Sequence, residues 1–355
     1  MSVDPGNESL ARYHRQRLLP GVGDAGQRRL LESSALIIGV GALGTVVAEH
    51  LCRAGVGRLT LVDRDIVELT NLQRQTLFDT ADADNSTPKA IAAQRRLLQI
   101  NPGVAITALV EHASARTLEA TLAASGAGVI VDATDNFQTR YVLNDLAVKR
   151  DVPLCYGGAI GTAGMSLTIR PGVTPCLRCL FPEPPPPGAA PTCDTAGVFA
   201  PVTGVIAGFQ AAEALKILLG REDLCATTLR EVDLWTCRLR ELNIDSARDP
   251  ACPCCGKRRF EHLESGLSDL SLALCGTSSI QISPPQSPGR SRLDLPALHA
   301  RLGPHGEFRL TTHLLKGTLR ESGLGLTVFP DARAMVHGTS DATLARTVYD
   351  RYVGA

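Results

Sequence analysis

A glycine-rich turn between an apolar run and a helical segment constrains this chain more than any other feature. Residues 35–40 form an apolar run that leads into Gly39, Gly41 and Gly44, and sequence without proline continues to Ala54. This pattern predicts a strand, a tight turn and a helix. Glycine lets the backbone approach a ligand closely, and the N–H groups at the start of a helix attract negative charge. We therefore expect an anionic ligand at the turn.

A carboxylate after the next strand indicates that this ligand is a nucleotide. Residues 58–62 predict a short strand that ends at Asp63, about 20 residues beyond Gly41, where a carboxylate can accept hydrogen bonds from ribose hydroxyls. A polar and cationic group then follows, which a hydride-transfer enzyme does not need but a triphosphate site does. Its members are Asp65, Asn71, Gln73, Arg74, Gln75 and Lys89.

Strands and helices alternate through the middle of the chain, which predicts an α/β fold. We expect a Rossmann-like, mainly parallel sheet with helices on both faces. The glycine-rich segment GGAIGTAG is expected to join two strands as a connection. The predicted elements are helices over 89–100 and 115–124 and from Phe199 onward, strands over 104–110, 128–131, 153–156 and 165–169, and a hairpin over 229–242.

Two acidic residues follow the predicted strand over 128–131. Asp132 and Asp135 would lie at the end of a parallel strand, where ligands bind. A carboxylate there could hold magnesium, which takes one or two protein oxygens and leaves its other positions to phosphate and water. Either acid could instead cap the helix that begins near Asn136. We expect Asp135 to hold the ion and Asp132 to have the more structural role.

The spacing of the cysteines predicts a metal site. Cys176 and Cys179 form one C-x-x-C pair, and Cys252 and Cys255 form another far downstream. Two such pairs favour a tetrahedral, structural zinc site with four thiolates, and Cys254 is expected to lie outside it. A redox C-x-x-C is the competing interpretation, but neither pair opens a helix after a strand.

A proline-rich segment, PEPPPPGAAPT, lies between the two cysteine pairs and is expected to be extended. It leads to Cys193, just upstream of the helix predicted from Phe199. The start of a helix can lower the pKa of a thiol and make it nucleophilic. For the remaining cysteines core filling is the default expectation. They are Cys52, Cys155, Cys225, Cys237 and Cys275.

Length and composition limit the partners, the cellular location and the domain organisation that the chain can have. The chain has 355 residues and a formal net charge of zero, so charge gives no argument for nucleic acid or an anionic membrane as partner. No apolar run has the length of a membrane span, and no secretory signal is evident, so we expect a cytoplasmic protein. The expected domains are an N-terminal helical arm over 1–33, a main domain with the nucleotide and zinc sites over 34–262, a linker over 263–275 and a small α/β domain over 276–355.

Taken together, the ordered motifs resemble the ThiF/MoeB/HesA family of ubiquitin-activating-like adenylyltransferases. The resemblance runs from about Ala11 to Gly256. It rests on RYHRQ, GVGALG, VDRDIVELTNLQRQ, the pair Pro88-Lys89, DATDN, the two cysteine pairs and TCDTAGV. The last 90 or so residues lie outside it, and a docking or dimer module is the modest interpretation of them.

The resemblance implies that ATP and magnesium bind at the sheet edge. The C-terminal glycine carboxylate of a ubiquitin-like sulfur carrier of the molybdopterin or thiamine type, ending in Gly-Gly, would then attack the α-phosphate. Arg15 resembles the family's arginine that reaches the partner subunit's ATP site, which implies a homodimer, although spacing alone favours a solvated helix face. Cys193 matches a cysteine of sulfur transfer, and a sulfurtransferase or cysteine desulfurase is a further expected partner. The implied nucleotide contacts are Gly39, Gly41, Gly44, Asp63, Asp65, Asn71, Arg74, Gln75, Lys89, Asp135 and Asn136.

Three alternatives remain open from the sequence. Within the family, the substrate could be another peptide or ubiquitin-like C-terminus. A nicotinamide-dependent oxidoreductase would account for the glycine turn and Asp63 but leaves Arg74, Lys89 and Asp135 without a role. A non-catalytic, zinc-stabilised scaffold would bind a carrier without turning over ATP.

Overall fold

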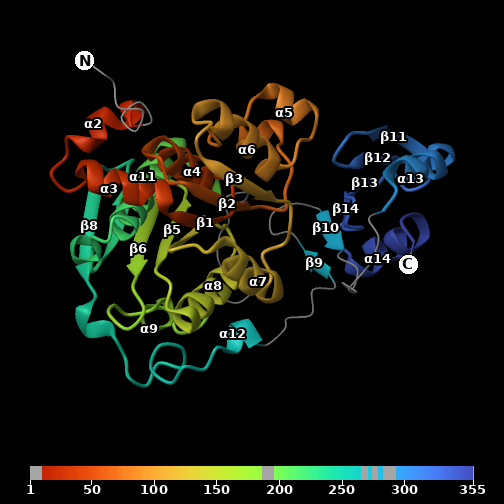
Figure 1. The fold of residues 1–355 in the computed structure, drawn as a ribbon. Helices are drawn as coiled ribbons and strands as arrows, with labels where there is room; N and C mark the ends of the chain where they lie inside the picture. The colour runs from red at the N-terminus through yellow and green to blue at the C-terminus, as the bar shows by residue number, and fades with distance from the viewer. Residues whose placement is uncertain (1–9, 186–195, 265–270, 274–278, 283–292, 355) are drawn as a thin grey trace, which may run out of the picture. The chain divides into compact units, whose positions relative to one another are not determined.

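The structure is a computed structural model that describes residues 10–185, 196–264, 271–273, 279–282 and 293–354 (Figure 1). The chain divides into two compact units, Met1–Ser265 and Gly266–Ala355. None of the described helices combines the length and the apolar character that crossing a bilayer requires.

The first unit is built on one eight-stranded sheet with the order β3-β2-β1-β4-β5-β6-β7-β8. The strands from β3 to β5 pair in parallel, and those from β5 to β8 pair in antiparallel fashion. Their bounds are β1 (Ser34–Ile38), β2 (Arg58–Val62), β3 (Ala105–Leu109), β4 (Val129–Asp132), β5 (Leu154–Ile160), β6 (Ala163–Ile169), β7 (Thr228–Asp233) and β8 (Arg238–Asn243). The sheet is thus a mixed α/β sheet of the Rossmann type.

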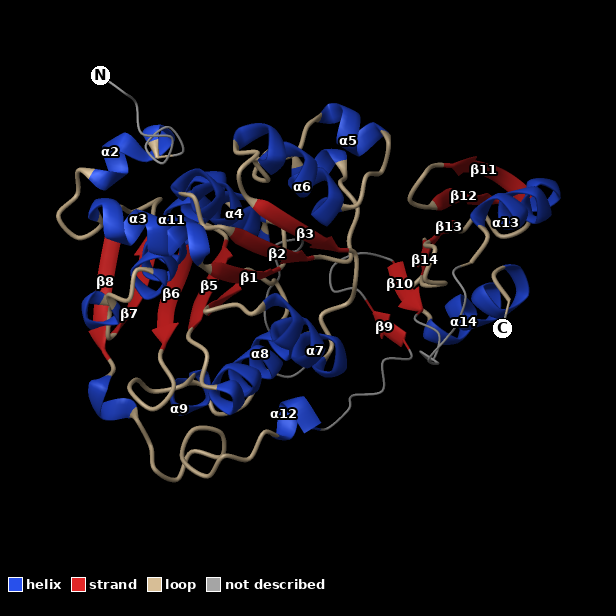
Figure 2. Cartoon of the chain, in the orientation of Figure 1, coloured by secondary structure: helices blue, strands red, loops and turns tan. Residues whose placement is uncertain are grey.

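Helices cover both faces of this sheet (Figures 1 and 2). One face packs against α4 (Ala42–Ala54), α6 (Lys89–Ile100) and α11 (Ala200–Leu218), and the other against α7 (Ala115–Ser125) and α8 (Phe137–Arg150). Strand β1 contributes to both layers, because its alternate side chains point to opposite faces. The smaller elements are η1 (Ala11–Tyr13), α2 (His14–Arg17), α3 (Gly23–Glu32), η2 (Leu69–Asn71), α5 (Thr80–Asp84), α9 (Leu177–Leu180), η3 (Glu222–Leu224), η4 (Asp245–Ala247) and α12 (Glu261–Glu264).

The order of the strands places a switch point between β1 and β4. The chain runs from β1 outward through β2 to β3 and then returns to β4 on the other side of β1. Loops at the carboxyl ends of β1 and β4 therefore lead away in opposite directions, and the crevice between them is where ligands bind in such sheets. The predicted glycine turn lies at this point.

The glycine-rich segment after residue 156 is strand rather than a connection, which corrects the sequence-based prediction. Gly157 and Gly158 lie in β5 and Gly164 lies in β6, joined by a tight turn at Gly161 and Thr162. A Cβ atom on Gly157 would lie 2.5 Å from the side chain of Gln210, and one on Gly164 would lie 2.6 Å from Ile206. These glycines are needed because α11 packs tightly against the hairpin.

The second unit holds a six-stranded antiparallel sheet with the order β11-β12-β13-β14-β10-β9. Helices α13 (Leu295–Leu302) and α14 (Ala342–Tyr352) pack against it through apolar side chains. The strands are β9 (Ser271–Ala273), β10 (Ser279–Ile282), β11 (Gly306–Leu310), β12 (Leu315–Leu319), β13 (Gly325–Val328) and β14 (Ala334–His337), and η5 spans Gly303–His305. Strand β9 lies within the segment expected as a linker, and β12 and β14 were not predicted from the sequence.

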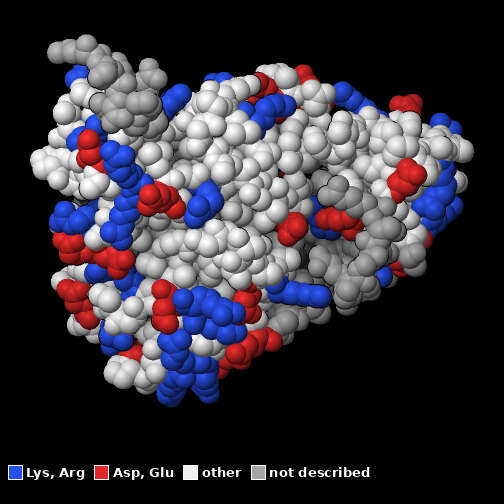
Figure 3. Space-filling view, viewed as in Figure 1, with Lys and Arg blue, Asp and Glu red and all other residues white. Residues whose placement is uncertain are grey.

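The charged residues of the surface are mixed in sign. Lys and Arg lie interspersed with Asp and Glu over the face that Figure 3 shows. This distribution agrees with the net charge of zero. It favours no polyanion as a partner on that face.

We predict that Gly44→Ala destabilises the protein by about 2 kcal/mol or more, because the added methyl group would overlap the carbonyl oxygen of Gly39. Gly208→Ala is the matched control, since nothing lies within 4 Å of its added Cβ in helix α11. That change should stabilise by about 0.5–1 kcal/mol through helix propensity. Chemical denaturation measures both, and equal stabilities of the two variants would contradict the close approach.

Candidate functional site

The glycine turn brings three segments into contact at the switch point. Gly39 adopts φ +87°, and a Cβ atom there would lie 2.6 Å from the carbonyl oxygen of Ala133. Helix α4 begins directly after Gly41, its N-cap residue. The first N–H groups of this helix therefore face the space above the turn, where an anion would be stabilised.

Asp63 connects the end of β2 to the glycine turn. Its Oδ2 accepts a hydrogen bond of 2.7 Å from the backbone N–H of Val40, and its Oδ1 accepts one of 2.8 Å from Asp65. Burial raises the pKa of Asp63 to about 6, although the charge of Lys89 and the two N–H donors oppose the shift. The carboxylate is thus oriented by the backbone at the edge of the glycine turn.

Lys89 is a buried cation among carboxylates. Its Nζ lies 3.1 Å from Asp65 Oδ2, and its backbone N–H donates to the carbonyl of Asp65 at 2.8 Å. Burial disfavours the charged ammonium, but the carboxylates of Asp65, Asp63 and Asp135 outweigh this cost and raise the pKa of Lys89. Lys89 therefore remains charged at the centre of the site.

The segment after η2 supplies the remaining polar side chains. Asn71 is buried, and its Oδ1 accepts a hydrogen bond of 3.0 Å from the backbone N–H of Glu68. Arg74 is half-buried, with Nη1 donating to the carbonyl of Thr70 at 2.9 Å. Gln75 is buried beneath the glycine turn, since a Cβ atom on Gly41 would lie 3.7 Å from its Nε2. All three predicted side chains belong to one turn beside α4.

The acidic residues after β4 divide differently from the prediction. Asn136 caps α8, because its Oδ1 accepts a hydrogen bond of 2.8 Å from the N–H of Thr139. Asp132 does not cap this helix; its Oδ1 accepts from the N–H and the hydroxyl of Thr134 at 3.0 and 2.7 Å. The possible cap by Asp132 is not formed, because Asp132 is fully buried at the end of β4. Asp135 is exposed and close enough to Lys89 to raise its pKa.

The arginines of the N-terminal arm have different environments. Arg12 Nη1 donates to the carbonyl of Ile100 at 2.8 Å, and Arg17 pairs with Asp24 at 2.7 Å. The buried Tyr13 accepts a hydrogen bond from Asn101 and anchors the arm. Of the arginines Arg12, Arg15 and Arg17, only Arg15 makes neither a hydrogen bond nor an ion pair within the described residues, and its side chain is exposed.

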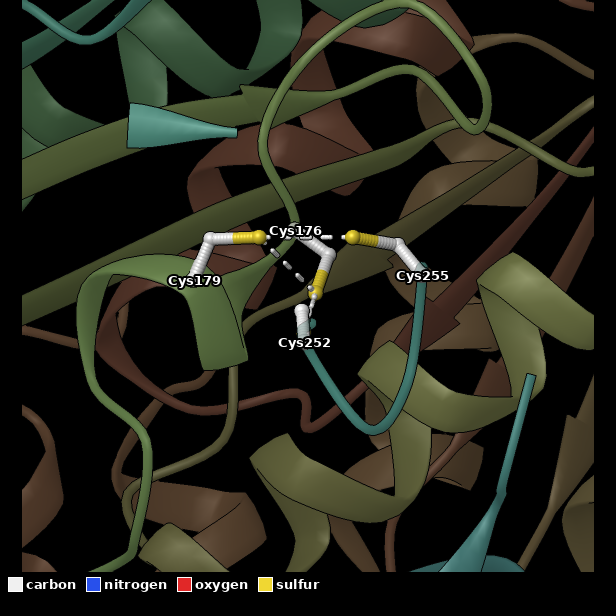
Figure 4. Close-up of side chains that lie close together, drawn as sticks. All are labelled: Cys176, Cys179, Cys252 and Cys255. Atoms are coloured by element: carbon white, nitrogen blue, oxygen red, sulfur yellow. Dashed lines mark hydrogen bonds between the residues drawn. The ribbon is translucent and has the colours of Figure 1, made fainter. Parts of the chain in front are cut away.

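The two C-x-x-C pairs converge (Figure 4), and their four Sγ atoms all lie within 4.8 Å of one another. The Sγ atom of Cys176 lies 3.9 Å from that of Cys179 and 3.7 Å from that of Cys252. The Sγ atoms of Cys179 and Cys255 are 3.3 Å apart. Tetrahedral thiolates about 2.3 Å from a zinc ion would be about 3.8 Å apart, so the spacing fits such an ion. Cys254 is fully buried outside this cluster, where its Sγ accepts from Asn144 at 3.3 Å. Cys193 lies outside the described residues.

Comparison with known proteins identifies the family. The sequence matches the ThiF family over residues 13–254, which is more than half of the chain. The chain belongs to the ThiF family.

Two curated relatives of this ThiF family member show how far the similarity extends. The protein of Bacillus subtilis named sulfur carrier protein ThiS adenylyltransferase is 42% identical over 344 residues, covering 97% of this chain and 99% of that protein. The sulfur carrier protein adenylyltransferase of Thermus thermophilus is 44% identical over 255 residues, covering 70% of this chain and 92% of that protein. Similarity to the first relative therefore includes both units.

Solved structures confirm the fold. A crystal structure of Escherichia coli MccB with ATP aligns with a TM-score of 0.60 at 24% identity, covering 71% of this chain and 76% of that one. At this identity the match supports the architecture of this ThiF family member and not its substrate.

Two polar residues near the site were not singled out from the sequence. Arg140 on α8 donates to the Thr134 carbonyl at 2.9 Å and to the Tyr156 hydroxyl at 3.0 Å, so it stands beside the loop that carries Asp135. Its position four residues after Asn136, on the first turn of a predicted helix, could have indicated from the sequence that Arg140 lies near the site. Gln210 on α11 donates to the carbonyls of Asp132 and Cys155 at 2.6 and 3.0 Å. No sequence pattern could reveal that contact, because it depends on how α11 packs.

We predict that Cys176→Ser or Cys252→Ser releases the bound metal and lowers the melting temperature by several degrees, because a tetrahedral thiolate site contributes folding energy. Metal analysis of the purified protein and thermal unfolding measure the two effects. Cys237→Ser is the control, since Cys237 is exposed and lies outside the cluster. Unchanged melting with no metal bound in the unaltered protein would contradict the site.

Proposed function

We propose that this chain adenylates the C-terminal glycine carboxylate of a ubiquitin-like sulfur-carrier protein, using ATP and releasing pyrophosphate. The observation that carries the proposal is the convergence of a glycine turn, a helix N-terminus, an oriented carboxylate and a buried ammonium at one edge of the sheet. The names of the relatives in Bacillus subtilis and Thermus thermophilus support a sulfur carrier as the substrate.

In this proposal each part of the site has a separate task. Gly39, Gly41 and Gly44 let the backbone approach the phosphates, and Asp63 accepts hydrogen bonds from the ribose. Arg74 and Lys89 oppose the phosphate charge. The remaining proposed nucleotide contacts are Asp65, Asn71, Gln75, Asp135 and Asn136.

The chemistry needs no general base. The attacking carboxylate, with an ordinary pKa of about 3.5, is ionised at neutral pH. Its oxygen forms a bond to the α-phosphorus while the bond to the bridging oxygen breaks, so pyrophosphate leaves with that electron pair. The acyl-adenylate is the product. The obstacle is repulsion between the carboxylate and the triphosphate, which the cations of the site reduce by position and charge.

Two metal ions belong to the proposal. Asp135 would hold magnesium, an ion that neutralises phosphate charge when bound. The carboxylate fits this role because it is exposed at the sheet edge beside Lys89. The four-cysteine cluster would hold zinc and link two segments remote in sequence.

The proposed assembly is a homodimer with shared sites. Arg15 supports this, because the arm that carries it is anchored through Tyr13 and Arg12 while its own side chain projects into solvent. Arg15 of each copy would then reach the ATP site of the other. The role of Cys193 in sulfur transfer stays a prediction.

We predict carrier-dependent ATP–pyrophosphate exchange with magnesium and a carrier that ends in Gly-Gly. Arg74→Ala should lower the exchange rate about 100-fold, because one charge that stabilises the transition state contributes about 3 kcal/mol. Arg96→Ala is the control, as this exposed arginine lies on α6 and contacts Gln99. Exchange that Arg74→Ala leaves unchanged would contradict the assignment, and no exchange with any carrier would favour another carboxylate or the scaffold alternative.

We predict that the KM for ATP rises as the pH falls from 7 to 5. Burial raises the pKa of Asp63 to about 6, so the carboxyl group becomes protonated in this pH interval. The protonated group is a poorer acceptor of hydrogen bonds from the ribose hydroxyls. In Asp63→Asn the KM should be high already at pH 7 and depend less on pH. The exchange assay over this pH range measures it, and parallel profiles for the two proteins would count against Asp63 as the ribose ligand.

A further inference from the structure

The order of the strands corresponds to the order of the parts of a bound nucleotide. Neighbouring strands β4, β1 and β2 lead into the loop of Asp135, the glycine turn and Asp63, in that order along the sheet edge. Under the proposed function, the phosphates lie over the first two and the ribose lies at Asp63. The base lies on the other side of the ribose from the phosphates. It therefore falls where β2 and the next strand, β3, end.

Two side chains meet at that place. Arg64 directly follows Asp63, and His112 follows the end of β3, which is held beside β2 by a hydrogen bond of 3.1 Å from the N–H of Asp63 to the Leu109 carbonyl. Arg64 Nη1 donates to His112 Nδ1 at 3.0 Å. On its other side, Arg64 Nε lies 3.6 Å from Asp65 Oδ1.

The hydrogen bond to His112 restrains the orientation of the Arg64 guanidinium. Because an arginine N–H can only donate, His112 Nδ1 accepts, and the neutral imidazole carries its hydrogen on Nε2. Asp65 lies close to both Arg64 and Lys89, so it offsets part of the charge of each. The Arg64 side chain is 20% exposed, which leaves part of it open to a ligand.

From this geometry we infer that the guanidinium of Arg64 forms the surface on which the adenine ring packs, with His112 as a positioning residue. A planar guanidinium stacks well on an aromatic face, and holding it in place reduces the entropy lost on binding. The inference rests on the proposed function and specifies how the site recognises the base of its nucleotide. It makes Arg64 a determinant of ATP affinity and not of the chemical step.

The test measures ATP binding directly by titration calorimetry, without a carrier. Arg64→Ala should raise the Kd for ATP about 10-fold or more, the usual scale for losing one base-stacking contact. Arg64→Lys should bind as weakly, because it keeps the charge and loses the plane. Arg64→Phe should bind within about threefold of the unaltered protein, because a ring replaces the flat surface. Arg58→Ala, at the opposite end of β2, is the matched control and should not change the Kd.

Two further measurements separate the possible causes. Binding of inorganic triphosphate should be equal in the unaltered protein and in Arg64→Ala, since this probe has no base. His112→Ala should weaken ATP binding less than Arg64→Ala does, as expected for a residue that only positions the guanidinium.

The outcomes also distinguish this inference from the proposed function. If the unaltered protein binds ATP and Arg64→Ala binds it equally well, the inference is overturned while the proposed function stands. If Arg64→Lys keeps its affinity for ATP and Arg64→Phe loses it, Arg64 acts through its charge. That result would likewise overturn the stacking role. Failure of the unaltered protein to bind ATP at all would overturn the proposed function itself.

Discussion

The site depends on the close contact of three backbone segments at the switch point of the sheet. Gly39 passes the carbonyl of Ala133, Gly44 of α4 packs onto the carbonyl of Gly39, and Asp63 accepts a hydrogen bond from Val40. Side chains larger than hydrogen would separate these segments. Because the ends of β1, β2 and β4 are held together in this way, the helix N-terminus, the oriented carboxylate and the loop of Asp135 face one volume.

Charge balance is the second condition for such a site. A buried ammonium costs free energy unless carboxylates surround it, and Lys89 has Asp65, Asp63 and Asp135 nearby. Burial raises the pKa of Asp63, and the charge of Lys89 and two N–H donors offset this shift only in part. The groups are therefore interdependent, and a change in one alters the protonation of the others. This interdependence suits a site that must hold a highly charged ligand in a dehydrated place.

Much of the fold and part of the site could be predicted from local patterns. The strand before the glycine turn, the helix from Lys89 to Ile100 and the hairpin over 229–242 carry short-range signals of periodicity and turn chemistry, and the structure contains each of them. The strands β12 and β14 were not foreseen, because they are only five and four residues long and their sequences, LKGTL and AMVH, contain few β-branched residues. The cap of α8 fell to Asn136 and not Asp132, since Asp132 is still part of β4. Arg140 and Gln210 reach their partners near the site only because of how α8 and α11 pack on the sheet.

By itself, the sequence determined the residue types and spacings: the glycine turn, the carboxylate after the second strand, and two C-x-x-C pairs whose spacing is typical of a metal site. Those features are local, so short-range chemistry is enough to recognise them. Only the tertiary structure decided which groups meet, because contacts such as Lys89 with Asp65, Arg64 with His112 and Cys176 with Cys252 join residues far apart in the chain. Such contacts depend on strand order and helix packing, which are set by the burial of the whole apolar core and not by any one segment.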